Sequence, residues 1–147
     1  MKITICGSIA FYDEMIVAKS ALEQRGHEAY IPPAQTQDIK GAVISVKDLY
    51  QIRQTATPHD QWVWDRKERA MMLHFEKVAW ADAILVLNYD KNGISGYIGA
   101  NTLLEMGLAF YLKKPIYLLN DIPTMHYSEE VLSMKPLVIR NSLELIG

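Results

Sequence analysis

Short apolar runs alternate with stretches of helical periodicity along the chain. The apolar, β-prone runs predict five strands, at Ile3–Cys6, Glu28–Ile31, Ala83–Leu87, Pro115–Leu119 and Leu137–Ile139. Apolar residues at helical spacing predict helices from Asp13 to a stop at Gly26, from Asp60 to about Trp80, from Thr102 to Leu112 and from Ser128 to Met134. A strand followed by a helix is therefore the repeating unit of the chain.

This alternation predicts an α/β fold with a parallel sheet and right-handed crossovers. The run Ala83–Leu87 is apolar throughout, which is typical of a strand that helices cover on both faces. We expect a flavodoxin-like or Rossmann-like three-layer sandwich, with a five-stranded parallel sheet and helices on both faces, in a single domain over residues 1–147. Ligands of such sheets bind at the carboxyl ends of the strands.

The pattern also predicts an inserted segment, a helix N-cap and two apolar helix stripes. Residues 34–57 are polar and weakly periodic, so we expect at most one short element there, inserted over a face of the sheet. Asp60 is in the position of a helix N-cap. Apolar stripes at helical spacing are formed by Met71, Phe75 and Val78, which we expect to be buried, and by Leu104, Leu108 and Tyr111.

The composition excludes several classes of protein. The chain has 15 basic and 17 acidic side chains and a net charge of −2, which argues against nucleic acid or an anionic membrane as a partner. No run approaches the roughly 20 apolar residues of a membrane span, and the run before Gly7 is too short for a signal-peptide core. The single cysteine, Cys6, excludes a disulfide scaffold, so we expect a core thiol in a cytoplasmic protein.

Neither a cofactor nor a metal is predicted. The loop after the first strand has one glycine, Gly7, and lacks both the dinucleotide-binding pattern and the P-loop pattern. The four histidines are scattered without the short spacing of zinc ligands. Because the chain has no basic surplus, we expect loop amides and a helix N-terminus to hold any anionic ligand.

Two loops at the predicted ligand edge are candidates for substrate contacts. The loop after the first strand contributes Gly7, Ser8, Ile9 and Phe11. The glycine-rich loop before the helix at Thr102 contributes Ser95, Gly96, Tyr97, Gly99 and Asn101. Such glycines let backbone amides approach an anion, although tight turns explain them equally well. Asn88 and Asn120 each follow a predicted strand, where a carboxamide binds a sugar or base or else closes a turn.

Glu105 lies within the first two turns of the helix predicted from Thr102. A glutamate at such a position commonly interacts with the helix dipole or completes a capping box. The alternative is a carboxylate that faces the ligand and acts as a nucleophile at an electron-poor sugar carbon.

Three motifs together favour the second alternative. They are the run GYIGANTLLEMGLA from Gly96 to Ala109, the return Lys114-Pro115-Ile116, and Cys6-Gly7-Ser8-Ile9 after the first strand. The first two lie in a segment, Asp82–Leu119, that resembles the nucleoside 2-deoxyribosyltransferase superfamily. The third is similar to the start of the deoxynucleoside 5′-monophosphate N-glycosidases in that superfamily.

The resemblance implies a flavodoxin-like fold and a double displacement. Glu105 would attack the anomeric carbon as the base departs, and a second base or water would resolve the glycosyl-enzyme ester. Gly7, Ser8 and the amides from Ser95 to Gly99 match the positions that hold the sugar and any 5′-phosphate. The resemblance also implies a homodimer or larger homo-oligomer in which a neighbour completes the pocket.

Three positions depart from the superfamily pattern. Thr4 stands near the place of a tyrosine, Ala10 in the place of a basic residue, and His74 in the place of an aspartate. His74 is either a partly buried structural histidine or a pocket residue beside Glu105. Trp62 and Trp64 are either a lid over a nucleobase or an intersubunit contact.

We therefore predict an enzyme that cleaves N-glycosidic bonds, either a deoxyribosyltransferase-like transferase or a nucleotide N-glycosidase. Its ligand is a small nucleoside or nucleotide, and its catalytic residues are Glu105 and His74. One alternative is a non-catalytic nucleotide-binding or sensor domain of the same fold, which the altered helper positions favour. Another is a phosphoribohydrolase, although the basic residue and Pro-Gly-Gly turn of that family are absent.

Overall fold

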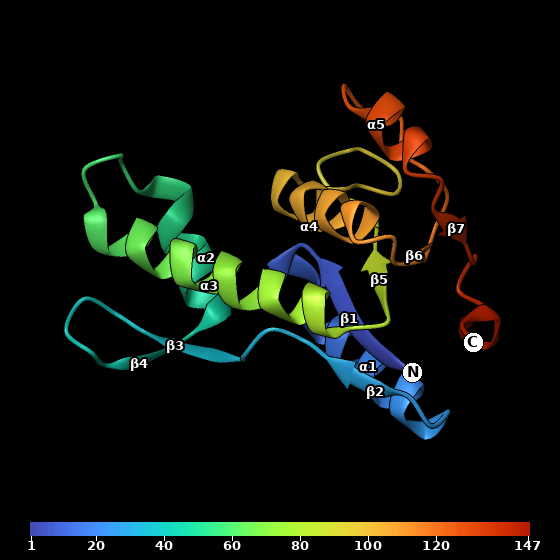
Figure 1. The fold of residues 1–147 in the computed structure, drawn as a ribbon. Helices are drawn as coiled ribbons and strands as arrows, with labels where there is room; N and C mark the ends of the chain where they lie inside the picture. The colour runs from blue at the N-terminus through green and yellow to red at the C-terminus, as the bar shows by residue number, and fades with distance from the viewer.

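The computed structural model describes residues 1–147, and a five-stranded, all-parallel sheet lies at its centre (Figure 1). Its strands, in spatial order, are β2 (Glu28–Tyr30), β1 (Lys2–Gly7), β5 (Ala83–Leu87), β6 (Ile116–Leu118) and β7 (Leu137–Val138). Counted within this sheet alone, the order is that of flavodoxin-like folds. The predicted α/β class and parallel sheet are confirmed.

Helices pack on both faces of the sheet, as predicted. Helix α1 (Tyr12–Gln24) covers one face, and α4 (Ala100–Tyr111), α5 (Ser128–Ser133) and the end of α3 (Gln61–Trp80) cover the other. Short 3-10 turns lie at Ile9–Phe11 (η1) and Leu143–Leu145 (η2). None of the helices combines the length and apolar character that crossing a membrane requires.

Alternate residues of β1 point to opposite faces and so belong to different cores. Ile3 and Ile5 pack in the α1 core with Met15, whereas Cys6 packs in the other core with Val78 and Met106. The thiol of Cys6 therefore points toward α3 and α4. Every residue of β5 is buried, which explains its unbroken apolar run.

The segment after β2 differs from the prediction of at most one short element. It forms an antiparallel hairpin of β3 (Gln35–Gln37) and β4 (Val43–Ser45), followed by α2 (Val46–Thr55). The Ser45 hydroxyl caps α2 by accepting a hydrogen bond from the amide of Asp48 at 3.0 Å. Each strand has three residues, too few to display a period of two.

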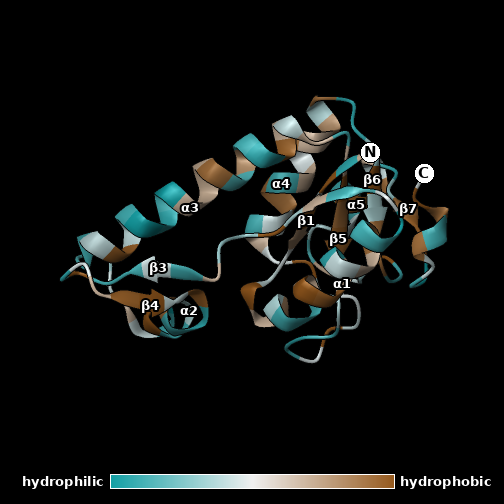
Figure 2. Ribbon diagram, turned by 90° about the horizontal axis from the view of Figure 1, so that it is seen from below, coloured by the Kyte–Doolittle hydropathy of each residue, from teal (hydrophilic) through white to brown (hydrophobic).

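The inserted hairpin and α2 lie beside the sheet rather than over one of its faces, which corrects the expectation (Figures 1 and 2). Helix α3 has 20 residues and is about 30 Å long, whereas β5, with five residues, spans only about 17 Å. The N-terminal half of α3 therefore extends past the carboxyl ends of the strands. Helix α2 packs there, against α3 and η1.

The predicted apolar stripes are also only partly correct. In α4, Leu104 is 52% and Tyr111 80% exposed, and the helix instead buries Thr102, Glu105, Met106 and Ala109. In α3, Val78 is buried as predicted, but Met71 and Phe75 are half-buried and the other buried residues are Val63 and His74. Asp60 is at the N-cap position, but its carboxylate accepts from the preceding Thr57 instead of from the helix.

Candidate active site

A cavity of about 320 Å³ opens at the carboxyl ends of β1 and β2. The overhanging half of α3 forms one wall, and β3, α2 and the start of α4 close the others. Among the predicted site residues, the cavity is lined by Gly7, Ile9, His74, Asn101 and Glu105. The cavity thus lies at the edge of the sheet where the topology predicts a ligand.

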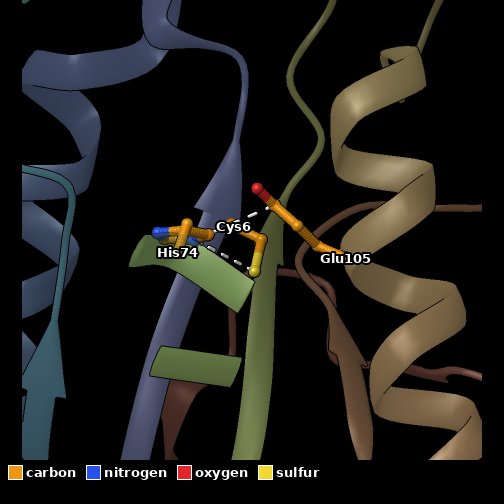
Figure 3. Close-up of side chains that lie close together, drawn as sticks. All are labelled: Cys6, His74 and Glu105. Atoms are coloured by element: carbon orange, nitrogen blue, oxygen red, sulfur yellow. Dashed lines mark hydrogen bonds and ion pairs between the residues drawn. The ribbon is translucent and has the colours of Figure 1, made fainter. Parts of the chain in front are cut away.

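Three buried side chains from different elements meet beside this cavity. Cys6 comes from β1, His74 from α3 and Glu105 from α4, and Figure 3 shows them pointing toward one another. The Cys6 Sγ lies 3.5 Å from His74 Nε2, which lies 3.8 Å from Glu105 Oε2. His74 is 6% exposed and Glu105 3%.

The helical period of α4 explains how Glu105 comes to face the sheet. Glu105 is three residues after Thr102, one before Met106 and four before Ala109, so all of them share the buried side. Asn101 lies one turn earlier, and its Nδ2 donates to Glu105 Oε1 at 2.9 Å. One carboxylate oxygen is therefore held by the helix itself, and the other remains free.

Burial determines the charge of these groups. It raises the pKa of Glu105 to about 7, and the neighbouring Cys6 thiol and the charge of Lys67 oppose this rise. Burial lowers the pKa of His74 to about 4 and raises the pKa of Cys6 well above its ordinary value. At neutral pH His74 is therefore uncharged and Cys6 is a thiol. The contact between His74 and Glu105 is not an ion pair under these conditions.

Three polar atoms of the site have no hydrogen-bond partner within the protein. They are His74 Nδ1, Asn101 Oδ1 and Glu105 Oε2, and all three are buried. Such groups are rare in folded proteins because each costs desolvation without compensation. Their residues line one cavity, which is the arrangement expected where a polar ligand supplies the missing partners.

Cys6, His74 and Glu105 are also a chemically suitable donor set for a transition metal. Their sulfur, nitrogen and oxygen atoms all lie within 4.8 Å of one another, and zinc binds these three donor types. The scattered spacing of the histidines did not indicate this set, because the fold brings a single histidine to the other two residues. Binding would require the Cys6 thiol to ionise.

The rest of the predicted first loop has structural contacts. Ser8 caps η1 through Ala10 N, and its hydroxyl also accepts a hydrogen bond from Lys91 Nζ at 2.9 Å. Lys91 further donates to the hydroxyl of Tyr50 at 2.8 Å, which ties the loop to α2. Phe11 is buried and packs edge-on against Tyr89, with ring centroids 5.3 Å apart.

Residues 92–99 of the glycine-rich loop do not line the cavity that holds Glu105. Ser95, Gly96 and Asn120 line a second, open depression together with Asp121 and Arg140. Gly99 is the N-cap of α4, and the ring of Tyr97 lies under Lys91 Nζ at 5.2 Å. Of the substrate contacts predicted from this loop, only Asn101, in the first turn of α4, lines the cavity that holds Glu105.

Asn88 joins the two loops of that region. Its buried Nδ2 donates to the carbonyls of Gly96, Asn120 and Asp121, and its Oδ1 accepts from Asn120 N at 2.8 Å. Every hydrogen-bonding atom of the side chain is therefore used within the protein, which favours the turn-closing alternative for this residue.

Sequence reasoning missed the basic side chains of the cavity. Arg53 from α2 and Arg66, Lys67 and Arg69 from α3 all line it. The run Arg66-Lys67-Glu68-Arg69 is visible in the sequence as a basic stretch, but without the fold it does not differ from a solvated helix face. No sequence pattern placed Arg53 at the cavity, because its segment was not predicted to be a helix.

The chain was compared with known proteins. No protein-family model and no curated protein sequence matches it. A solved structure does: the 2-deoxyribosyltransferase of the psychrotolerant bacterium Bacillus psychrosaccharolyticus. That match has 18% identity and a TM-score of 0.46, and it covers 80% of this chain and 70% of that chain.

Proposed function

We propose that this protein cleaves the N-glycosidic bond of a nucleoside or nucleotide, with Glu105 as the nucleophile. The proposal rests on the environment of the Glu105 carboxylate. A carboxylate that is 3% exposed lines a cavity at the ligand edge of the sheet, with Oε1 held by Asn101 and Oε2 without a partner.

In the first step, Glu105 Oε2 bonds to the anomeric carbon while the carbon–nitrogen bond to the base breaks. The base leaves with the electron pair of that bond, and the sugar remains as an ester of Glu105. In the second step, water or another base attacks the same carbon and releases the carboxylate. With water, one proton passes to the departed base and the hydroxyl stays on the sugar.

The surroundings of Glu105 suit this role. A pKa of about 7 leaves an appreciable fraction of the carboxyl group ionised at neutral pH, and the ionised form is poorly solvated. Asn101 fixes the rotation of the carboxylate, and the other oxygen, Oε2, has no hydrogen-bond partner. The neutral His74 packs beside Oε2 and acts as a positioning residue rather than as a proton donor.

Release of free base from a panel of ribonucleosides, deoxyribonucleosides and their monophosphates, followed by chromatography, tests the proposal. We expect release by the wild type and a loss of about 10³-fold or more in Glu105→Gln. Glu76→Gln, which changes an exposed carboxylate of α3, is the matched control and should retain activity. Equal rates in Glu105→Gln and the wild type, or no release from any compound, would contradict the proposal.

A zinc-dependent reaction would also be lost in Glu105→Gln, so a second variant separates the two mechanisms. Cys6→Ala removes a donor of the metal set but leaves the nucleophile in place. We expect this variant to lose less than about tenfold in activity. We also expect a glycosyl adduct on the peptide that contains Glu105, detected by mass spectrometry after acid quenching. Binding of a nucleotide without release of base would favour the sensor alternative.

A further inference from the structure

The wall of the cavity carries an excess of positive charge. Arg53, Arg66, Lys67 and Arg69 line it, whereas Glu105 is the only carboxylate among the lining residues. The cationic groups come from two elements, α2 and α3, which pack against each other at this place. A cluster of this kind inside a cavity differs from cations spread over a solvated surface.

None of these four cations has a partner of opposite charge in the protein. The ion pairs of lysine and arginine lie elsewhere, at Lys19–Glu23, Lys47–Asp13 and Arg140–Asp121. Arg66 uses its Nε to donate to the carbonyl of Gln37 at 3.1 Å, and Arg53 lies 5.6 Å from the ring centre of Tyr50. None of the four therefore forms an ion pair within the chain.

The cations are also partly withdrawn from solvent. Arg53, Arg66 and Lys67 are half-buried, and burial lowers the pKa of both Arg53 and Lys67. The charge of Arg53 lowers the pKa of Lys67 further, whereas the charge of Glu105 raises it. Lys67 is thus close enough to feel the charges of both Arg53 and Glu105. A protein gains nothing in stability from holding like charges together in this way.

An anionic ligand would remove that cost, and the side chains indicate which anion. Guanidinium groups bind phosphate oxygens through two parallel hydrogen bonds, and lysine binds phosphate as a point charge. A phosphate monoester carries a charge of about −1.5 to −2 at pH 7, which matches several cations better than a single carboxylate does. The wall also contains Tyr30, Pro32 and Met71, which are apolar enough to pack against a base.

We propose that Arg53 and Lys67, flanked by Arg66 and Arg69, form a phosphate subsite, so that the substrate is a phosphorylated nucleoside. This inference rests on the proposed function, since it concerns the substrate of the same cavity. Lys67, whose charge acts on Glu105, offsets the repulsion between the phosphate and the carboxylate. From the sequence we expected loop amides to bind an anion. In this proposal the cationic side chains of α2 and α3 bind it instead.

Isothermal titration calorimetry with Glu105→Gln tests the subsite without turnover. A deoxyribonucleoside, its 5′-monophosphate and inorganic phosphate are titrated separately, so that a phosphate ester is distinguished from free phosphate. We expect the monophosphate to bind at least tenfold more tightly than the nucleoside. Adding Arg53→Gln or Lys67→Gln should weaken binding of the monophosphate by about 10- to 100-fold, as expected for loss of a charged hydrogen bond. Binding of the nucleoside should change less than threefold.

Arg25→Gln, which changes an exposed arginine after α1, is the matched control and should leave both affinities unchanged. Circular dichroism confirms that each variant is folded, and a misfolded variant would lose nucleoside and monophosphate binding alike. Equal affinities for nucleoside and monophosphate, or an unchanged ratio in both cavity variants, would overturn the inference. Tighter binding of a single-stranded oligonucleotide than of the monophosphate would also overturn it.

The two proposals fail in different ways. If the monophosphate binds as expected but no base is released, the subsite stands and the reaction fails. If base is released equally from nucleosides and monophosphates, and Arg53→Gln and Lys67→Gln leave that ratio unchanged, the reaction stands and the subsite fails.

Discussion

At the scale of single residues, burial disfavours the charged forms of both Glu105 and His74, and it therefore shifts their pKa values in opposite directions. Both are almost fully buried, and their facing atoms are 3.8 Å apart. Burial keeps a proton on the carboxyl group to higher pH and keeps a proton off the imidazole to lower pH. Between these limits the Glu105 and His74 side chains are largely uncharged.

The first prediction concerns the pH dependence of base release. A nucleophilic Glu105 must be ionised, so kcat/KM should rise about tenfold per pH unit below about 7 and then level off. Cys6→Ala removes a neighbouring thiol that lowers the pKa of Glu105, so its profile should move to higher pH. Steady-state rates between pH 5 and about 9 measure this. A profile of Cys6→Ala that coincides with that of the wild type, or lies at lower pH, would contradict the assigned contact.

The second prediction concerns the free energy of unfolding. The folded-state pKa of Glu105 lies above its ordinary 4.5, so its contribution is present at low pH and is lost as the pH rises toward 7. The folded-state pKa of His74 lies below its ordinary 6.5, so its contribution is present above that pH and is lost as the pH falls toward 4. The two effects oppose each other between pH 4.5 and 6.5.

Urea unfolding at several pH values separates the two contributions. In Glu105→Gln we expect the free energy of unfolding to rise by about 3 kcal/mol from pH 4 to 6.5, because only His74 still titrates. In His74→Gln it should fall by a similar amount between pH 4.5 and 7. The wild type and the surface control Glu76→Gln should show flatter profiles. Parallel profiles in all four proteins would contradict the burial of these charges.

At the scale of elements, backbone geometry restricts the loop between β5 and α4. Gly93 and Gly96 both have positive φ, at 73° and 68°. A Cβ on Gly96 would lie 2.6 Å from the carbonyl oxygen of Asp121, whereas a Cβ on Gly93 would meet no atom within 4 Å. Of these two glycines, only Gly96 lies against the segment that follows β6.

This difference gives a matched pair of variants for the third prediction. Gly93→Ala introduces a side chain in the left-handed region and should cost about 1–2 kcal/mol of unfolding free energy. Gly96→Ala adds the clash with Asp121 to the same cost and should exceed it by at least about 1 kcal/mol. Urea unfolding at neutral pH measures both. Equal losses in the two variants would show that the contact with Asp121 does not restrict the loop.

The sequence predicts an element best when all of its residues are equally buried. Strand β5 is apolar throughout because helices cover both of its faces. The inserted hairpin was missed because its strands are short and its residues are half-buried or exposed. In α4, polar residues such as Glu105 are buried while Leu104 and Tyr111 are exposed, so hydrophobic periodicity indicated the wrong face.

The candidate site was predicted in part for a similar reason. Glu105 belongs to a sequence motif, the run from Gly96 to Ala109, and the order of the strands places that motif at the ligand edge of the sheet. Cys6 lies 68 residues before His74, and their contact depends on the packing of α3 across β1. Arg53 enters the cavity through a helix that the pattern did not predict. No local spacing could therefore indicate the basic wall.

At the scale of the whole molecule, the near-neutral net charge conceals an uneven distribution. The chain has 15 basic and 17 acidic side chains, and four of the basic ones but only one acidic one line the cavity. The rest of the molecule therefore carries 11 basic and 16 acidic side chains. A small anion is attracted to the cavity, whereas a long polyanion also meets the acidic remainder.

The last prediction follows from this distribution. Binding of a deoxyribonucleoside 5′-monophosphate to Glu105→Gln should weaken by about tenfold or more when the salt concentration rises from about 0.05 to 0.5 M, because the cavity charges are screened. Binding of the neutral nucleoside should change less than twofold over this range, and duplex DNA should not bind at the lower concentration. Calorimetric titrations at both salt concentrations measure all three. A monophosphate affinity that does not depend on salt would indicate that the phosphate lies outside the basic cavity. Tight binding of DNA would indicate that the acidic side chains elsewhere on the molecule do not exclude a polyanion.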